Sequence, residues 1–334
     1  MTRLPAPSSL LKASALCLAS TLLAAGAHAE DSYKFFGTLD YGYFKGYDDK
    51  SQFGSISRSN VGFDASKDLT QDLAATAKIS TRFFIRDTST GDFFVNEDTK
   101  YLGSGEATAG IKGSFGHLRI GRALTAVWSN DWNYDAWGNY DSIASPAWQL
   151  WHYNSPADPN ASTRNASYLR LNNGVFYASP VFGGGFSVDA SYGAKTQTGD
   201  KNHSTSVALK YNQKEFGAMY GQETTPGGNT FKFVGGKVNF GNFSVMASYD
   251  DESLYGGGKS RSSTLSGRYT HGSMSYLLGF GRQLDDKANF YSAGASYAYK
   301  PNTNLYVSYG NQAKGFHGNA KAVDAYGVGV NFSF

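Results

Sequence analysis

Residues 291–299 read Tyr-Ser-Ala-Gly-Ala-Ser-Tyr-Ala-Tyr, so that from Tyr291 onward every second residue is Tyr or Ala and the others are Ser, Gly or Ala. Successive side chains of a strand point to opposite faces, and a period of two therefore predicts a strand with one apolar and one more polar face. The same alternation recurs in residues 186–193, 243–250 and 274–281. Repeated strands of this kind predict an all-β protein.

The composition supports this fold class. The 334 residues include 40 Gly, 23 Tyr and 23 Phe, and only 17% of them are charged, against about 25% in a typical soluble domain. Residues that favour strands and tight turns therefore dominate, and the chain is too aromatic to be disordered. After the first thirty residues no run approaches the ~20 apolar residues that a spanning helix needs. With 30 Lys+Arg against 27 Asp+Glu, the charge does not suggest a nucleic-acid partner.

The connections between the expected strands alternate in length. Tight turns are expected at 179–180, 241–242, 271–272 and 301–304, and longer polar loops at 194–202, 251–259, 283–288 and 312–320. Short turns on one side and long loops on the other are typical of an antiparallel up-and-down β-barrel in a bacterial outer membrane. A soluble β-sandwich also has alternating strands, but here the apolar face is rich in Tyr and Phe near strand ends, and the opposite face is Ser, Gly and charge.

About sixteen strands of ~10 residues fit the chain. A barrel of this size encloses a water-filled channel, and its closure pairs every backbone N–H and C=O, as a lipid environment requires. The sequence therefore predicts one transmembrane barrel domain over residues 30–334.

The first 29 residues have the features of a signal peptide. Arg3 and Lys12 are followed by an apolar stretch over 13–27, and Ala27-His28-Ala29 fits the small-x-small cleavage pattern. Cleavage after Ala29 also removes Cys17, the single cysteine, so the mature chain has no disulfide.

Four segments resemble the trimeric general porins of Gram-negative bacteria. Residues 57–69 resemble the second strand of that family and the turn after it, and residues 107–122 resemble the hairpin that leads to its third loop. Residues 175–192 resemble the hairpin after that loop, and 326–334 end in Phe334 like the last strand of an outer-membrane barrel. The resemblance implies a homotrimer surrounded by outer-membrane lipids and lipopolysaccharide, in which each barrel is a passive diffusion channel for small hydrophilic solutes and ions and needs no cofactor. It also implies that a third loop, here expected at 123–163, folds inward and narrows the pore.

In this family a basic ladder on the barrel wall faces acidic groups on the third loop. Strand alternation assigns most of the candidate wall residues to the lumen, and Arg122 ends its strand at the base of the loop. The loop offers three carboxylates, and opposed charges across a narrow channel would create a transverse field that orients solutes. Alternatively, an arginine in a water-filled lumen is simply solvated. The candidate wall residues are Arg58, Asp64, Lys78, Arg82, Arg119, Arg122 and Arg170, and the candidate loop carboxylates are Asp131, Asp135 and Asp141.

All five tryptophans fall within the expected third loop, at Trp128, Trp132, Trp137, Trp148 and Trp151. Their flat rings suit the C–H faces of sugars, which would make the protein an oligosaccharide-preferring porin. The alternative is that they pack the loop against the wall. A hypothesis of a different class is a surface receptor or adhesin that uses its exposed loops.

Catalysis has little support in the sequence. No G-x-S-x-G motif occurs, and the histidines have no Glu or Cys at metal-ligand spacing. Residues 256–260 resemble the end of a phosphate-binding loop, but Ser253 replaces its first glycine. We therefore expect neither an enzyme nor a metal site.

Overall fold

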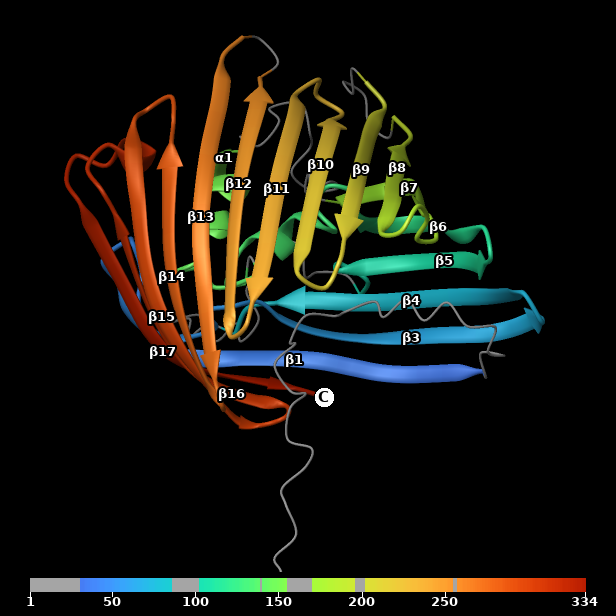
Figure 1. Ribbon diagram of the computed structural model, residues 1–334, viewed down its shortest axis with the longest axis horizontal. Coiled ribbons are helices and arrows are strands. Elements are labelled where there is room, and N and C mark those ends of the chain that lie inside the picture. The colour runs from blue at the N-terminus through green and yellow to red at the C-terminus, as the bar shows by residue number, and fades with distance from the viewer. Residues whose placement is uncertain (1–30, 86–101, 139, 155–169, 196–201, 255–256) are drawn as a thin grey trace, which may run out of the picture.

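The computed structural model describes residues 31–85, 102–138, 140–154, 170–195, 202–254 and 257–334. The expected signal peptide lies outside these residues. Strands make up most of the described chain, and short helical elements lie between some of them (Figure 1).

The strands follow one another along the chain with few interruptions. They are β1 (Ser32–Lys45), β2 (Ser51–Gly54), β3 (Ser59–Thr70), β4 (Leu73–Phe83), β5 (Glu106–Gly113), β6 (Gly116–Leu124), β7 (Arg170–Ala178), β8 (Phe186–Gly193), β9 (Ser204–Asn212), β10 (Phe216–Thr224), β11 (Thr230–Phe240), β12 (Phe243–Ser253), β13 (Lys259–His271), β14 (Met274–Gln283), β15 (Ala288–Lys300), β16 (Thr303–Gln312) and β17 (Val323–Ser333). The helical elements are the 3-10 turn η1 (Asp131–Tyr134), the helix α1 (Pro146–Asn154) and the 3-10 turn η2 (Phe316–Gly318).

The sheet closes on itself between its first and last strands. From β3 to β17 each strand pairs antiparallel with the next, and β1 pairs with β3 through Ser32–Thr38 and with β17 through Thr38–Lys45. Backbone hydrogen bonds of 2.9 and 3.0 Å join Gly37 and Phe334 at the seam. The short strand β2 pairs only with the end of β1, so sixteen strands form the ring. The predicted antiparallel barrel is confirmed.

The two faces of the strands differ as the alternation predicted. On β14, Tyr276 and Leu278 are exposed on the outside of the barrel, whereas Leu277 between them is buried inside. The aromatic C-terminal residues Tyr326, Phe332 and Phe334 are also exposed. The outer surface is thus apolar and aromatic, as lipid contact requires.

The turns at one end of the barrel are mostly tight. Strands β11 and β12 are joined by Gly241–Asn242 and β13 and β14 by Gly272–Ser273. The turn expected at 179–180 is wider, because Gly183 and Gly184 adopt positive φ angles of 54° and 76° and the chain does not re-enter a strand until Phe186. At the opposite end, the loop expected at 283–288 spans only residues 284–287.

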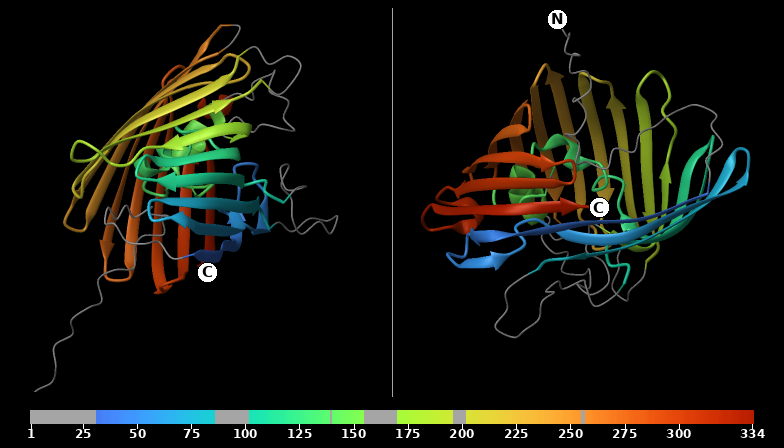
Figure 2. Two further views of the ribbon diagram at one scale, coloured as in Figure 1. Left: turned by 90° about the vertical axis from the view of Figure 1, so that its right-hand side faces the viewer. Right: turned by 90° about the horizontal axis from the view of Figure 1, so that it is seen from below.

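The described residues that follow β6 fold into the barrel, where α1 packs against β13, β14 and β15 (Figure 2). Strand β6 continues to Leu124, so the expected loop start at Ala123 is two residues too early. The structure describes residues 125–138 and 140–154 of this segment, which we call the inner loop. Its expected end at Thr163 lies outside the described residues.

Glycines on the inner face of the wall allow this close approach. A Cβ atom at Gly235 of β11 would lie 2.4 Å from Tyr134, and one at Gly281 of β14 would lie 2.4 Å from Leu150. At Gly310 of β16, the carbonyl oxygen of Ile143 would be 2.3 Å away. An added side chain at any of these glycines would force a neighbour to move, so glycine allows the inner loop to lie close to the wall.

Apolar side chains fill the space between the inner loop and the wall. Trp128 stacks on Phe231 with ring centroids 5.4 Å apart, and the edge of Trp151 meets Phe233 at 4.8 Å. Leu150 is fully buried in the same cluster. The part of the lumen between these side chains of the inner loop and the wall is therefore filled by a packed core and holds no open channel.

Replacing Gly235 by Val should displace Tyr134 and destabilise the folded barrel by about 1–3 kcal/mol, because extra volume in a packed core forces side chains and backbone to shift. Urea unfolding followed by tryptophan fluorescence measures this change. The neighbouring Gly236 has no atom within 4 Å of an added Cβ, so Gly236→Val is the matched control. Equal stability of the two variants would contradict the role assigned to Gly235.

Candidate functional site

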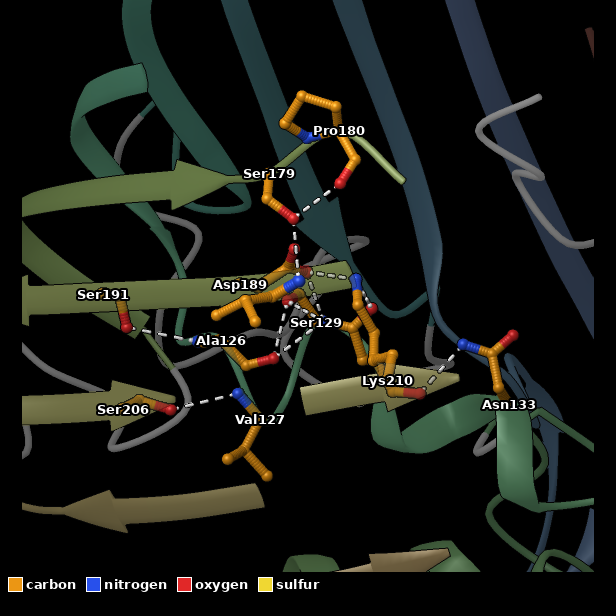
Figure 3. A network of polar contacts seen from close by, with 12 residues as sticks. Ala126, Val127, Ser129, Asn133, Ser179, Pro180, Asp189, Ser191, Ser206 and Lys210 are labelled. Atoms are coloured by element: carbon orange, nitrogen blue, oxygen red, sulfur yellow. Dashed lines mark hydrogen bonds and ion pairs between the residues drawn. The ribbon is translucent and has the colours of Figure 1, made fainter. Parts of the chain in front are cut away.

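The inner loop is fixed to the wall by backbone-to-hydroxyl hydrogen bonds where it leaves β6 (Figure 3). The backbone N–H of Ala126 donates to Ser191 Oγ of β8 at 3.2 Å, and that of Val127 donates to Ser206 Oγ of β9 at 3.0 Å. Serines that face the lumen thus serve as acceptors for a segment that has no strand partner of its own.

Charged and amide groups strengthen the same attachment. Asp189 Oδ2 of β8 accepts hydrogen bonds from Asn130 Nδ2 at 2.7 Å and from Lys210 Nζ of β9 at 2.6 Å. Lys210 also donates to Asn130 Oδ1 at 3.0 Å. The three side chains form a closed polar network beneath the start of the inner loop.

Further along, the inner loop is attached to β13, to β16 and to the turn between β1 and β2. The N–H of Ala136 donates to Ser266 Oγ of β13 at 2.9 Å, and the hydroxyl of Tyr47 donates to the carbonyl of Ile143 at 2.6 Å. Within α1, Gln149 Oε1 accepts from Gln312 Nε2 of β16 at 2.8 Å. Because it is attached at both ends and along its length, the described inner loop is a fixed part of the channel.

The three loop carboxylates predicted from the sequence are buried, with exposures of 0% for Asp131, 3% for Asp135 and 5% for Asp141. Asp135 Oδ2 accepts hydrogen bonds from Ser145 Oγ at 2.9 Å and from the N–H of Trp137 at 3.1 Å. The three carboxylates therefore expose almost no surface to the channel.

Asp141 holds a turn of the inner loop against β16. Its Oδ1 accepts from the N–H groups of Ile143 and Ala144, both at 2.8 Å, and its Oδ2 accepts from the hydroxyl of Ser308. Burial raises the pKa of Asp141, while these hydrogen bonds act in the opposite direction. Burial raises the pKa of Asp131 well above its usual value.

The tryptophans of the inner loop differ in their surroundings. Trp128 and Trp151 are buried in the core described above. Trp137 packs beside Gly279 and Gly294 of β14 and β15, and Trp132 donates its indole N–H to the carbonyl of Ser129 at 2.7 Å.

Trp148 meets the opposite wall. The guanidinium carbon of Arg58 lies 4.1 Å from the centre of the Trp148 ring. The ring of Phe84 is nearly perpendicular to that of Trp148, with their centroids 6.4 Å apart. This contact brings together one predicted wall residue and one predicted loop residue.

Two further arginines of this wall, Arg170 and Arg82, lie on β7 and β4. Arg170, the first residue of β7, is buried and donates from Nε to the carbonyl of Gly105 at 2.6 Å. Arg82 lies opposite Asn60 in the β3–β4 register, and its backbone N–H donates to Ser104 Oγ at 3.3 Å. The residues just before β5 thus support both arginines.

Arg122 is placed differently from the other wall candidates. It lies opposite Ala107 in the β5–β6 register, directly after Gly121, whose φ angle is 126°. Its side chain donates to the carbonyl of Ser104 at 3.1 Å and to the side chain of Asn172. Arg122 therefore joins the end of β6 to its two neighbours.

A second charged group lies further along the same strands. Lys78 of β4 is 3.9 Å from Asp64 of β3 and 3.4 Å from Glu106 of β5, and Glu106 also pairs with Arg119 of β6. Strand alternation predicted the lumen face for Asp64, Lys78 and Arg119. Glu106 was missed, although Ala107 and Ala109 on the alternate positions indicate that it too faces inward.

Comparison with known proteins places this geometry in a family. A model described as Gram-negative porin matches residues 13–334. The chain belongs to the Gram-negative porin family. It is therefore an outer-membrane channel protein, and the predicted location and channel function are confirmed. Among the described residues, no helix is both long and apolar enough to cross a membrane, and no group of three or more His, Cys, Asp or Glu residues could hold a metal ion.

The curated relatives are distant in sequence, but the matches cover most of both chains. The major outer membrane protein P.IB of Neisseria gonorrhoeae is 26% identical over 297 residues, covering 75% of this chain and 77% of the relative. A monosaccharide porin of a Halomonas species is 28% identical, covering 85% of this porin and 75% of the relative.

Solved structures share the fold. An anion-selective porin from Comamonas acidovorans has a TM-score of 0.74 at 20% identity, covering 91% of this porin and all of the other chain. The trimer form of OmpT from Vibrio cholerae has a TM-score of 0.65 at 17% identity, covering 92% of this porin and all of the other chain.

Replacing Asp141 by Ala should lower the stability of the porin and increase the noise of its open-channel current. The substitution leaves two buried N–H groups without an acceptor, at a cost of about 1–3 kcal/mol each. It also removes the attachment of this turn of the inner loop to Ser308 of β16. Urea unfolding and single-channel recording in a planar bilayer measure the two effects. Asp48→Ala, on an exposed turn between β1 and β2, is the control. An Asp141→Ala channel as stable and as quiet as this control would contradict the anchoring role.

Proposed function

We propose that this porin is a passive diffusion channel that favours small anions and is active as a homotrimer in lipopolysaccharide-containing outer membrane. The mature channel is residues 30–334, after removal of residues 1–29. The solute moves down its gradient through the space between the inner loop and the wall formed by β3 to β7, and no chemical step or cofactor takes part.

The observation that carries this proposal is the unequal exposure of charge at the two sides of that space. The inner loop buries Asp131, Asp135 and Asp141 to 5% exposure or less. On the opposite wall the side chains of Lys78 and Arg119 are 30% and 25% exposed. Arg58 and Arg82 are half-buried, and Arg170 is buried.

Charge on a pore wall sets ion preference because a low-dielectric surround focuses the field into the narrow aqueous space. With the loop carboxylates buried, the charge nearest the aqueous space is that of the wall, where cationic side chains outnumber the carboxylates of Asp64 and Glu106. An anion therefore has a lower electrostatic barrier than a cation of the same size. The fold neighbour from Comamonas acidovorans, described as anion-selective, supports this proposal.

Sugar transport is the second candidate, because Trp148 is only half-buried and its ring stacks with Arg58. A ring that stacks with an arginine can also stack with a sugar, and the arginine can donate hydrogen bonds to its hydroxyls. Two relatives are described as a monosaccharide porin and a chitoporin. Burial of Trp128 and Trp151 removes these two rings from any such surface.

A potassium chloride gradient across a planar bilayer should give a reversal potential with the sign of chloride preference, and Arg58→Gln/Arg82→Gln should move it towards zero. Removing two charges from this wall lowers the anion-to-cation permeability ratio about threefold or more. Lys214→Gln, on an exposed turn between β9 and β10, loses a positive charge away from this wall and should leave the ratio unchanged. Potassium preference in the wild-type porin would contradict the proposal. Insertion steps in groups of three test the trimer, and a protein that does not conduct would favour the receptor hypothesis.

Neutral sugars of increasing length should not block the current if ion diffusion is the main function. Under the sugar hypothesis they block it in a concentration-dependent way, and Trp148→Ala abolishes the block. Phe182→Ala removes an exposed aromatic ring from the turn between β7 and β8 and serves as the control. A block that Trp148→Ala removes and Phe182→Ala does not would establish a sugar site.

A further inference from the structure

We propose that Glu106 is a specificity-determining residue of the channel. It holds Lys78 and Arg119 against the wall and cancels much of their charge, and it thereby limits the preference for anions. This inference rests on the proposed ion-diffusion function. Within that function it assigns a role to a carboxylate of the wall, outside the inner loop.

The geometry places Glu106 between two cations on neighbouring strands. As the first residue of β5 it is flanked by β4 and β6. Its Oε2 lies 3.4 Å from Lys78 Nζ of β4, and its Oε1 pairs closely with the guanidinium of Arg119 of β6. The hydroxyl of Thr108, two residues further along β5, donates to the same Oε1 at 3.1 Å. Three donors from three adjacent strands therefore fix one carboxylate.

Burial makes this carboxylate more effective than an ordinary surface partner. The side chain of Glu106 is 16% exposed, against 25% for Arg119 and 30% for Lys78. Asp64, the other carboxylate near Lys78, is more exposed and 3.9 Å away. Since water screens an interaction less as burial increases, Glu106 is the main local counter-charge.

The two cations are also held back from the lumen. The guanidinium carbon of Arg119 lies 5.7 Å from the ring centre of Phe176, and Lys78 Nζ lies 5.3 Å from that of Phe36. Long basic side chains extend their charge into water when no partner holds them. Loss of the Glu106 charge would therefore remove one negative charge from the wall and release two positive ones. Both effects favour anions.

Arg170 and Arg58 have other partners than Glu106. Arg170 contacts the carbonyl of Gly105 and Arg58 contacts the ring of Trp148. The ion pairs of Glu106 are with Lys78 and Arg119. Glu106 thus lowers the positive charge of the wall at Lys78 and Arg119. It does not change the charge at Arg58 and Arg170.

The test is the reversal potential of Glu106→Gln channels in a potassium chloride gradient across a planar bilayer. The anion-to-cation permeability ratio should rise roughly threefold over the wild-type porin, as expected for the removal of one charge at short range in an aqueous pore. Glu106→Asp keeps the charge and should stay near the wild-type ratio. Glu215→Gln, on an exposed turn between β9 and β10, is a matched loss of one carboxylate elsewhere and should have no effect.

A second pair of variants covers the case in which Glu106→Gln does not fold. Lys78→Met should lower the ratio, and the charge-neutral Glu106→Gln/Lys78→Met should return it to the wild-type value. Heat-resistant trimers on gels verify folding. If Glu106 only stabilises the barrel, Glu106→Gln changes the unfolding midpoint but not the reversal potential, and this result overturns the inference.

The outcomes for this inference and for the proposed function are distinct. A wild-type porin that prefers cations refutes the proposed anion preference, yet a shift towards anions in Glu106→Gln would still support the role of Glu106. An anion-preferring wild type whose ratio is the same in Glu106→Gln refutes the role of Glu106 alone.

Discussion

The whole structure depends on one requirement, that each backbone N–H and C=O facing lipid finds a partner within the protein. An open sheet would leave two edges unpaired, and here the requirement is met by pairing of β1 with β17, where Thr38–Lys45 align with Tyr326–Ser333. The C-terminal residue takes part directly, because Phe334 exchanges hydrogen bonds with Gly37. Ring closure joins β1 to β17, so the barrel is complete only when every strand between them has formed.

Closure creates a lumen wider than a solute filter needs, and the chain fills part of it with the inner loop. The wall is adapted to receive that loop in two ways. Glycines such as Gly235 and Gly281 remove the side chains that would collide with Tyr134 and Leu150, and serines such as Ser206 and Ser266 accept hydrogen bonds from its backbone. The high Gly content and the Ser-rich inner face, which serve strand turns and lumen solvation elsewhere, here also hold the constriction in place.

This anchoring has an electrostatic consequence. The carboxylates of Asp135 and Asp141 accept hydrogen bonds from the inner loop's own backbone and hydroxyl groups, so they stabilise its shape and contribute little exposed charge. The cations on β3 to β7 therefore face a loop with buried acids. The counter-charge on that wall comes from strand residues, chiefly Glu106. Acidic residues thus stabilise the inner loop on one side of the lumen and balance positive charge on the other.

The sequence alone determined the barrel, its approximate strand number and the face of most side chains, because strand alternation is a local property with a period of two residues. It identified the lumen face of Lys78 and Arg119, but it did not show that Glu106 pairs with both, since those partners lie on different strands. It placed Asp141 in the constriction, but it did not show that this carboxylate is bound to Ser308, 167 residues away in the chain. Which tryptophans pack and which reach the channel also depended on contacts across the ring. Only the tertiary structure decided these points, because partner choice and burial depend on register and closure, which bring distant residues together.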